Sequence, residues 1–171
     1  MTRRIILTVL GSDRPGLTQA LADAVMAAGG NWLESHLSHL GGQFVGSVLV
    51  ELPADRVSRL EDEARRIDAA GLQVALISAT DAPAPGGNGM GIELVGQDRP
   101  GIVQEVTRAL AALGVNIEEF ASSTDNTAWS GELLFRAHAW LTLPQGVTMD
   151  AVRTALEGIS GEIMVDLSTR K

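Results

Sequence analysis

The chain contains nearly the same segment twice. Residues 11–31 read GSDRPGLTQALADAVMAAGGN, and residues 96–116 read GQDRPGIVQEVTRALAALGVN. Extended to residues 11–34 and 96–119, the two copies align without gaps, 85 positions apart, and eleven of the 24 residues are identical. A repeat of this kind within 171 residues favours two copies of one small unit over a single continuous core.

Apolar residues recur in both copies at the spacing of an amphipathic helix. The shared spacing is i, i+4, i+7, i+8 and i+11, with Leu17, Leu21, Ala24, Val25 and Ala28 in the first copy and Ile102, Val106, Ala109, Leu110 and Leu113 in the second. The pattern predicts a helix that buries one stripe. We expect it to open after the proline of DRPG, at a first-turn position, and to end at Gly29 or Gly114.

The remainder of each half also repeats. Residues 44–53 match residues 135–144, now 91 apart, so the second copy has a hairpin about six residues longer near 124–131. A second amphipathic helix follows in each half, and then a last strand at 72–76 or 163–167. Each half therefore reads strand–helix–strand–strand–helix–strand, which is the order of the ferredoxin-like unit.

The predicted fold is α+β, with a first unit at residues 1–80, a Pro/Gly-rich linker at 81–91 and a second unit at 92–171. A unit of roughly 80 residues is small for a lone core, and its sheet has an unpaired edge. We therefore expect the two ferredoxin-like βαββαβ units to pair edge to edge. The result would be an antiparallel sheet of about eight strands with the helices on one side.

Composition narrows the classes of partner. The formal charge is −8, from 13 basic and 21 acidic residues, whereas proteins that bind nucleic acid usually show a basic patch. No apolar run approaches the roughly 20 residues of a membrane helix, and the N-terminal segment has too few apolar residues for a signal peptide. We expect a cytoplasmic protein without a membrane or a direct nucleic-acid partner. There is no cysteine, so disulfides and thiol chemistry are excluded.

The repeated DRPG has a structural and a functional interpretation. In the structural one, Asp13 and Asp98 cap the helix, the proline presets its first turn and the glycine relieves crowding. In the functional one, the helix N-terminus attracts a carboxylate, and the aspartate accepts hydrogen bonds from an ammonium group. The two together match the charged ends of a free amino acid. Asn31 and Asn116 begin the next strand, from which an amide could reach a neighbouring loop.

The order strand–DRPG–helix–GxN–strand resembles the ACT domain, a regulatory module that binds ligands in amino-acid metabolism, and the resemblance covers both halves. It is similar to tandem-ACT proteins of the glycine cleavage system transcriptional repressor type. This implies a small amino acid, with glycine or serine as the first candidates, bound where the loop of one unit meets strand two of its partner. The implied ligand-binding residues are Ser12, Asp13, Gly16, Leu17 and Asn31 in the first unit and Gln97, Asp98, Gly101, Ile102 and Asn116 in the second. Trp32 follows Asn31 and could fill space that a ligand would use.

Other residues carry weaker signals. His36 and His39 lie three apart on a predicted strand and therefore face opposite sides, which makes them poor joint metal ligands. We expect all three histidines, including His138 on one strand face with Arg136 and Trp140, to serve in surface or interface packing rather than in catalysis. The charges at residues 61–66 form i, i+4 pairs typical of a solvated helix face, and no serine has a base at a recognisable spacing. Trp129, in the longer hairpin, is equally consistent with core anchoring and partner contact.

Three function classes remain open. The first is an amino-acid-sensing regulatory module, whose partner, by resemblance, would be a transcriptional activator protein that it restrains. The second is a protein-interaction module that has lost ligand binding, and the third is an enzyme or a direct DNA binder. We expect no catalysis, metal or cofactor, because the glycines at 86–91 do not form a dinucleotide loop and no phosphate loop is present. The oligomeric state is left open, and a homo-oligomer is one option.

Overall fold

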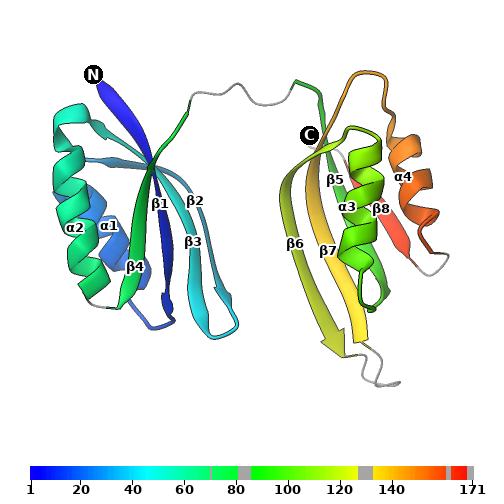
Figure 1. Cartoon of the computed structure of the whole chain (residues 1–171), viewed down its shortest axis with the longest axis horizontal. Coiled ribbons are helices and arrows are strands. Elements are labelled where there is room, and N and C mark those ends of the chain that lie inside the picture. The colour runs from blue at the N-terminus through cyan, green and yellow to red at the C-terminus, as the bar shows by residue number, and fades with distance from the viewer. Residues whose placement is uncertain (70, 81–85, 127–132, 161–162, 169–171) are drawn as a thin grey trace. The chain divides into compact units, whose positions relative to one another are not determined.

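Both halves of the chain fold into the same arrangement of strands and helices (Figure 1). The computed structural model describes the chain except for residues 70, 81–85, 127–132, 161–162 and 169–171. It divides into one unit at Met1–Ala82 and another at Pro83–Lys171. Within the described part, no helix is long and apolar enough to cross a membrane.

The first unit is a four-stranded antiparallel sheet in the order β2-β3-β1-β4, with α1 and α2 on one face (Figure 1). Its elements are β1 (Thr2–Ser12), α1 (Leu17–Ala27), β2 (Asn31–Leu40), β3 (Gln43–Pro53), the short 3-10 helix η1 (Ala54–Arg56), α2 (Val57–Ala69) and β4 (Leu72–Ser78). The outer strands are β2 and β4.

The second unit repeats this topology with the order β6-β7-β5-β8. Its elements are β5 (Asn88–Gln97), α3 (Ile102–Ala112), β6 (Asn116–Asn126), β7 (Leu133–Leu143), α4 (Met149–Glu157) and β8 (Met164–Ser168). The predicted α+β class and the two ferredoxin-like units are therefore confirmed. The pairing of the two four-stranded sheets into one sheet of about eight strands stays a prediction.

The start of β5 differs from the predicted linker at 81–91. β5 begins at Asn88, because residues 88–91 pair with residues 140–143 of β7, and Met90 and Gly91 are buried. The connection between β6 and β7 is longer than the two-residue turn between β2 and β3, as the repeat predicts. Trp129 and the tip of that hairpin lie outside the described residues, as do linker residues 81–85.

Alternation along the strands produces the core of the first unit. Ile5, Leu7 and Val9 of β1 are buried, because they face the helix layer, where Val25 of α1 and Leu60 of α2 are also buried. The side chains between them on β1 lie on the opposite, open face of the sheet. Burying one such aliphatic side chain contributes about 1.5–3 kcal/mol.

The second unit has its own core. Met90 and Leu94 of β5 and Leu141 of β7 are buried together with Leu110 of α3 and Leu156 of α4. In the described part of the chain, each buried cluster draws its residues from one unit alone. Each unit therefore carries a separate hydrophobic core.

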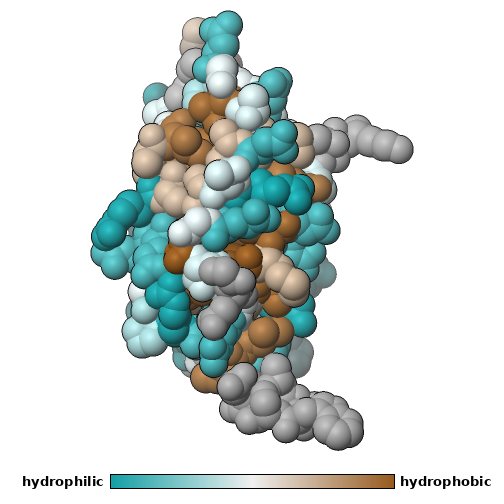
Figure 2. All heavy atoms as spheres, turned by 90° about the vertical axis from the view of Figure 1, so that its right-hand side faces the viewer, coloured by the Kyte–Doolittle hydropathy of each residue, from teal (hydrophilic) through white to brown (hydrophobic). Residues whose placement is uncertain are grey.

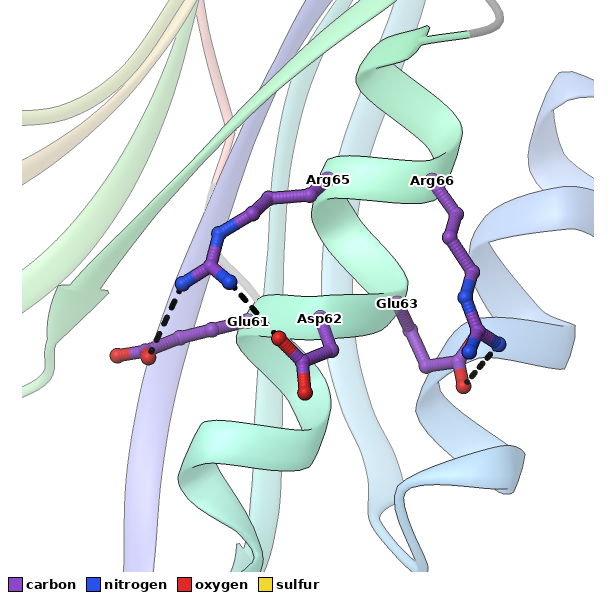
Figure 3. A network of polar contacts seen from close by, with 5 residues as sticks. All are labelled: Glu61, Asp62, Glu63, Arg65 and Arg66. Carbon is purple, nitrogen blue, oxygen red and sulfur yellow. Dashed lines mark hydrogen bonds and ion pairs between the residues drawn. The ribbon is translucent and has the colours of Figure 1, made fainter.

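The charged residues of α2 form the predicted solvated face. Arg65 contacts Glu61 at 3.8 Å and Asp62 at 2.8 Å, and Arg66 contacts Glu63 at 2.9 Å (Figure 3). The contacts join side chains on adjacent turns of one helix, so they support α2 without forming a site. Hydrophobic and hydrophilic residues are intermixed on the face of the molecule seen in Figure 2.

Candidate ligand site at the two helix starts

The DRPG loops join β1 to α1 and β5 to α3. In each loop the glycine is the N-cap residue, with left-handed backbone at φ 94° for Gly16 and 90° for Gly101. A Cβ at either position would meet no heavy atom within 4 Å. Glycine is therefore required by the backbone conformation, which other residues rarely adopt, and the expectation that it relieves crowding is wrong.

The predicted aspartate caps are also wrong. Neither helix has a side-chain cap, because the N-cap is glycine, which displaces Asp13 and Asp98 to three positions before it. The prolines likewise lie before the N-cap, outside the first helical turn. The first-turn N–H groups of α1 and α3 are thus left without the side-chain acceptor that normally satisfies one of them. These groups and the positive end of the helix dipole favour an anion.

Asp13 of the first loop already has a partner. Its Oδ2 lies 2.7 Å from Nδ1 of His39, near the end of β2, and its N–H donates to the carbonyl of Gly42 at 3.4 Å. Both side chains are partly exposed, with 37% of Asp13 and 61% of His39 accessible. His39 was not among the predicted site residues. Its contact with Asp13 depends on the course of β2, whose last residues lie beside the DRPG loop.

Asp98 of the second loop is placed differently. Its N–H donates to the carbonyl of Leu133 at 2.8 Å, which anchors the loop to β7 as Gly42 anchors the first loop. The residue is half-buried, and its carboxylate makes no ion pair with any side chain that the structure describes. Among the side chains that the structure describes, Asp98 is therefore the motif aspartate whose carboxylate has no ion-pair partner.

Arg99 of the second loop forms a charged pair with Glu105 of α3. Arg99 donates from Nη1 to Oε1 of Glu105 at 3.0 Å and from Nη2 to Oε2 at 2.5 Å, so that the guanidinium holds the carboxylate in a two-point contact. This hydrogen bonding, with the charges of Arg99 and Arg108, holds the pKa of Glu105 below its ordinary value. The position of Glu105 is occupied by Ala20 in the first copy, so only the second DRPG arginine has this glutamate.

The two asparagines lie far from the loop of their own unit. Asn31 pairs with Glu51, which pairs with Arg4, and Arg4 is eight residues along β1 from Ser12. At about 3.3 Å per residue, this separation is about 26 Å. Asn116 stands at the level of Gly89, again eight residues from Gln97. A single unit therefore does not bring its asparagine to its own DRPG loop.

The remaining predicted residues are placed as their sequence pattern indicates. Ser12 and Gln97 end their strands at the surface, and Leu17 and Ile102 are buried beneath the helix starts, where they hold the loops to the core. Trp32 packs against the core of the first unit, on the helix side of the sheet. His36 contacts Glu34 at 3.0 Å, and no group of metal-binding side chains occurs among the described residues.

Family models match both units. A model described as the ACT domain matches residues 3–76, and a second model with the same description matches residues 91–138, so together they cover more than half of the chain. Both matches include a DRPG loop and the helix that follows it. The chain belongs to the ACT-domain family.

Several known proteins are similar to this tandem ACT chain. Phosphoserine phosphatase SerB2 of Mycobacterium tuberculosis (strain ATCC 25618 / H37Rv) is 29% identical over 171 residues, which cover 96% of the chain and 40% of the relative. The chain thus spans well under half the length of this curated relative. A crystal structure of an unknown protein from Galdieria sulphuraria is 27% identical, with a TM-score of 0.81 and 100% of both chains covered.

A third similarity concerns the fold alone. The crystal structure described as a "putative glycine cleavage system transcriptional repressor" is 14% identical to this chain. The TM-score is 0.72, and 99% of each chain is covered. The fold of the whole chain is thus also found in that structure.

Proposed function

We propose that the chain is a non-catalytic regulatory protein that binds a small amino acid at its ACT loops. The observation that carries this proposal is the helix start without a side-chain cap, next to the carboxylate of Asp98, which has no ion pair with a described side chain. The helix N–H groups would receive the ligand carboxylate, and Asp98 would accept from the ligand ammonium group. Gly101, whose Cβ position is open, would let the ligand approach the backbone.

A second ACT unit would complete the site. β2 and β6 are edge strands, and antiparallel pairing of such an edge with the same edge of another ACT unit reverses its direction. The asparagine end of one strand would then lie beside the DRPG end of the other. In this arrangement Asn31 or Asn116 would contribute an amide to a ligand held by its partner's loop, which explains its distance from its own loop.

The first loop would bind more weakly than the second. Because His39 contacts the carboxylate of Asp13, a ligand ammonium group would have to displace the histidine or share the carboxylate with it. Asp13, Gly16 and Asn31 remain part of the proposed site set, with Ser12 and Leu17, and the second set is Gln97, Asp98, Gly101, Ile102 and Asn116. For the first unit alone, the same His39 contact also favours the alternative function, in which the unit contacts a partner protein without binding a ligand.

Glycine and serine are the proposed ligands. The fold of the chain resembles that of a structure described as a glycine cleavage system repressor, and its curated relative is named a phosphoserine phosphatase. Both names refer to small amino acids or their derivatives. The phosphatase activity in the relative's name is not carried over, because the chain spans 40% of that protein. We propose no catalysis within these residues.

The proposed target of regulation is a cytoplasmic protein, namely a transcriptional activator, rather than DNA. A net charge of −8 repels a phosphate backbone at long range. The direct test is a gel shift with promoter DNA at two salt concentrations. No retardation is expected, and tight, salt-sensitive binding would refute this part of the proposal.

Calorimetric titration with glycine and with serine tests the ligand. Micromolar to millimolar affinity is attainable for a molecule of five to ten heavy atoms, at about 1.5 kcal/mol per atom or less. Asp98→Ala should weaken binding about ten-fold or more, because a charged hydrogen bond contributes about 1.5–3 kcal/mol. Asp98→Asn, which keeps the shape, is the matched variant, and Asp13→Ala should have the smaller effect. Equal affinity in the wild type and the Asp13→Ala/Asp98→Ala protein would contradict the proposed site. If neither glycine nor serine binds the wild type, the proposed ligands are wrong, and a thermal-shift screen with twenty amino acids would separate a different ligand from none.

A further inference from the structure

The open face of the second sheet carries a tryptophan lying across two glycines. A Cβ built on Gly89 would lie 3.0 Å from Cζ2 of Trp140, and one on Gly91 would lie 3.1 Å from Cζ3. The nearest atoms also include Cε2 and Nε1 on one side of the indole and Cε3 on the other. The ring therefore lies over the β5 backbone, which only glycine makes possible at these two positions.

Carboxylates surround this tryptophan. In the strand register, Trp140 of β7 pairs with Gly91 of β5, and a β-bulge in β6 places Glu119 opposite it on the other side. One step along the sheet, Glu93 pairs with Asp166 of β8. Trp140 and these three acidic residues line one cavity of about 340 Å³, within the size range of ligand pockets.

The repeat supplies an internal comparison, because the first unit has the same strands in the same register. The first unit also has an acid, Glu34, at the position of Glu119, but its other equivalent positions on the open face are neutral, and most of them are apolar. In the order first unit to second unit, they read Ile6 to Gly91, Thr8 to Glu93, Leu49 to Trp140, Ala75 to Asp166 and Ile77 to Ser168. The glycine, the aromatic ring and two of the three acids thus occur together in the second unit alone.

The basic side chains near the cavity do not cancel the negative charge of its carboxylates. His138 Nε2 lies 3.7 Å from Glu93 Oε1, but 69% of the histidine and 45% of the glutamate are accessible. Arg136, on the same strand, contacts Asp125 at 3.5 Å. Neither Glu119 nor Asp166 has an ion pair with a side chain in the part of the chain that the structure describes. No group of side chains suited to a metal ion occurs among those residues.

We propose that this cavity binds an arginine side chain in an exposed, extended segment of a partner protein. A planar guanidinium stacks on an indole, and its forked N–H groups match carboxylates in two-point contacts. A lysine ammonium would satisfy the charge but not the planar stacking. An anion is excluded as occupant by the three carboxylates. A shallow site on a sheet face suits a protruding side chain, and this proposal is independent of the DRPG loops.

A peptide titration tests the proposal. The probe is the acetylated, amidated peptide Arg-Gly-Arg-Gly-Arg, and the readout is the indole N–H signal of Trp140, identified by its loss in Trp140→Phe. We expect a saturable shift of this signal. In Glu93→Gln/Asp166→Asn the dissociation constant should rise about ten-fold, because two charged contacts are lost. The amide spectrum of this variant checks that the unit is folded. Binding to the wild type should weaken as the salt concentration rises.

Matched controls exclude general charge attraction. Glu61→Gln/Asp62→Asn removes two acids from α2, far along the sequence in the other unit, and should leave the dissociation constant within two-fold. The lysine version of the peptide should bind several-fold more weakly, and Asp13→Ala/Asp98→Ala should bind the arginine peptide like the wild type.

An unshifted Trp140 signal, or equal losses of affinity in both charge variants, would overturn the proposal. Free L-arginine binding as tightly as the peptide would show a small-molecule site instead. Dissociation of a homo-oligomer in Glu93→Gln/Asp166→Asn would assign the face to a second copy, and either result refutes the partner segment.

Discussion

Nδ1 of His39 lies 2.7 Å from Oδ2 of Asp13, a contact that links the end of β2 to the DRPG loop of the first unit. The second unit has the same motif and the same topology, but Asp98 has no such partner among the described side chains. Two copies of one motif therefore present different chemistry. The difference arises on the strand that follows the helix, because His39, which pairs with Phe44 in the first unit, is replaced at the equivalent register position of the second unit by Thr124, which pairs with Phe135.

Removing His39 should have little effect on stability. The Asp13–His39 pair is partly exposed, so solvent screens it, and such pairs contribute about 1 kcal/mol or less. His39→Ala should lower the free energy of unfolding by no more than that, measured by urea denaturation. In a double-mutant cycle with Asp13→Ala, a coupling energy above about 2 kcal/mol would show that the pair is more strongly held than its exposure indicates.

Removing the acid of the Arg99–Glu105 pair should have an effect that depends on pH. The folded-state pKa of Glu105 is below its ordinary value, mainly because Arg99 donates hydrogen bonds to it. Its contribution is therefore present above the unfolded pKa of about 4.3 and is lost as pH falls through the lower folded value. Glu105→Gln should be less stable than the wild type at pH 7, and this difference should shrink below pH of about 4.

Urea denaturation at pH 7, 5 and 3 measures this difference. Glu157→Gln on α4 is the control, because it removes an exposed glutamate at a distance from Arg99 in the sequence. A stability difference for Glu105→Gln that grows as the pH falls would contradict the assignment of the Arg99 contact.

Replacing the N-cap glycine should destabilise the second unit through the backbone. Gly101 has φ 90°, and a Cβ there meets nothing, so the cost comes from the left-handed conformation alone. Gly101→Ala should lower the free energy of unfolding by about 1–2 kcal/mol. Gly101→Asn should cost less, because asparagine tolerates this region better. Equal stability of wild type and Gly101→Ala, by thermal unfolding, would mean that the loop adopts another conformation.

Much of the fold could be predicted because it rests on local periodicity. The spacing of Leu17, Leu21 and Val25 indicates one buried helical stripe, and all three residues are buried in α1. The repeat then predicts the same element order twice, since a duplicated pattern of apolar residues has the same faces to bury. The predicted linker extended too far because Asn88 to Gly91 contain two glycines, a composition typical of loops, although they pair with β7.

The candidate site was only partly predictable. The sequence alone placed Asp13, Gly16, Asp98 and Gly101 in two loops at helix starts, because DRPG and the helical stripe are adjacent along the chain. It assigned the cap to the aspartates, since side-chain preference does not reveal that the backbone turns left-handed at the glycine. Which atoms of a loop remain available depends on the conformation of that loop.

Tertiary structure decided the relationships between residues distant in sequence. The partner of Asp13 follows from the return of β2 after 26 residues, and the position of Trp140 over Gly91 follows from the pairing of β7 with β5. Neither relationship has a periodic signature, because strand pairing joins segments through the hydrogen-bond register rather than through spacing along the chain. The sequence by itself therefore determined the two units and the loops that begin their helices. The register of their sheets decided which charges those loops and faces present.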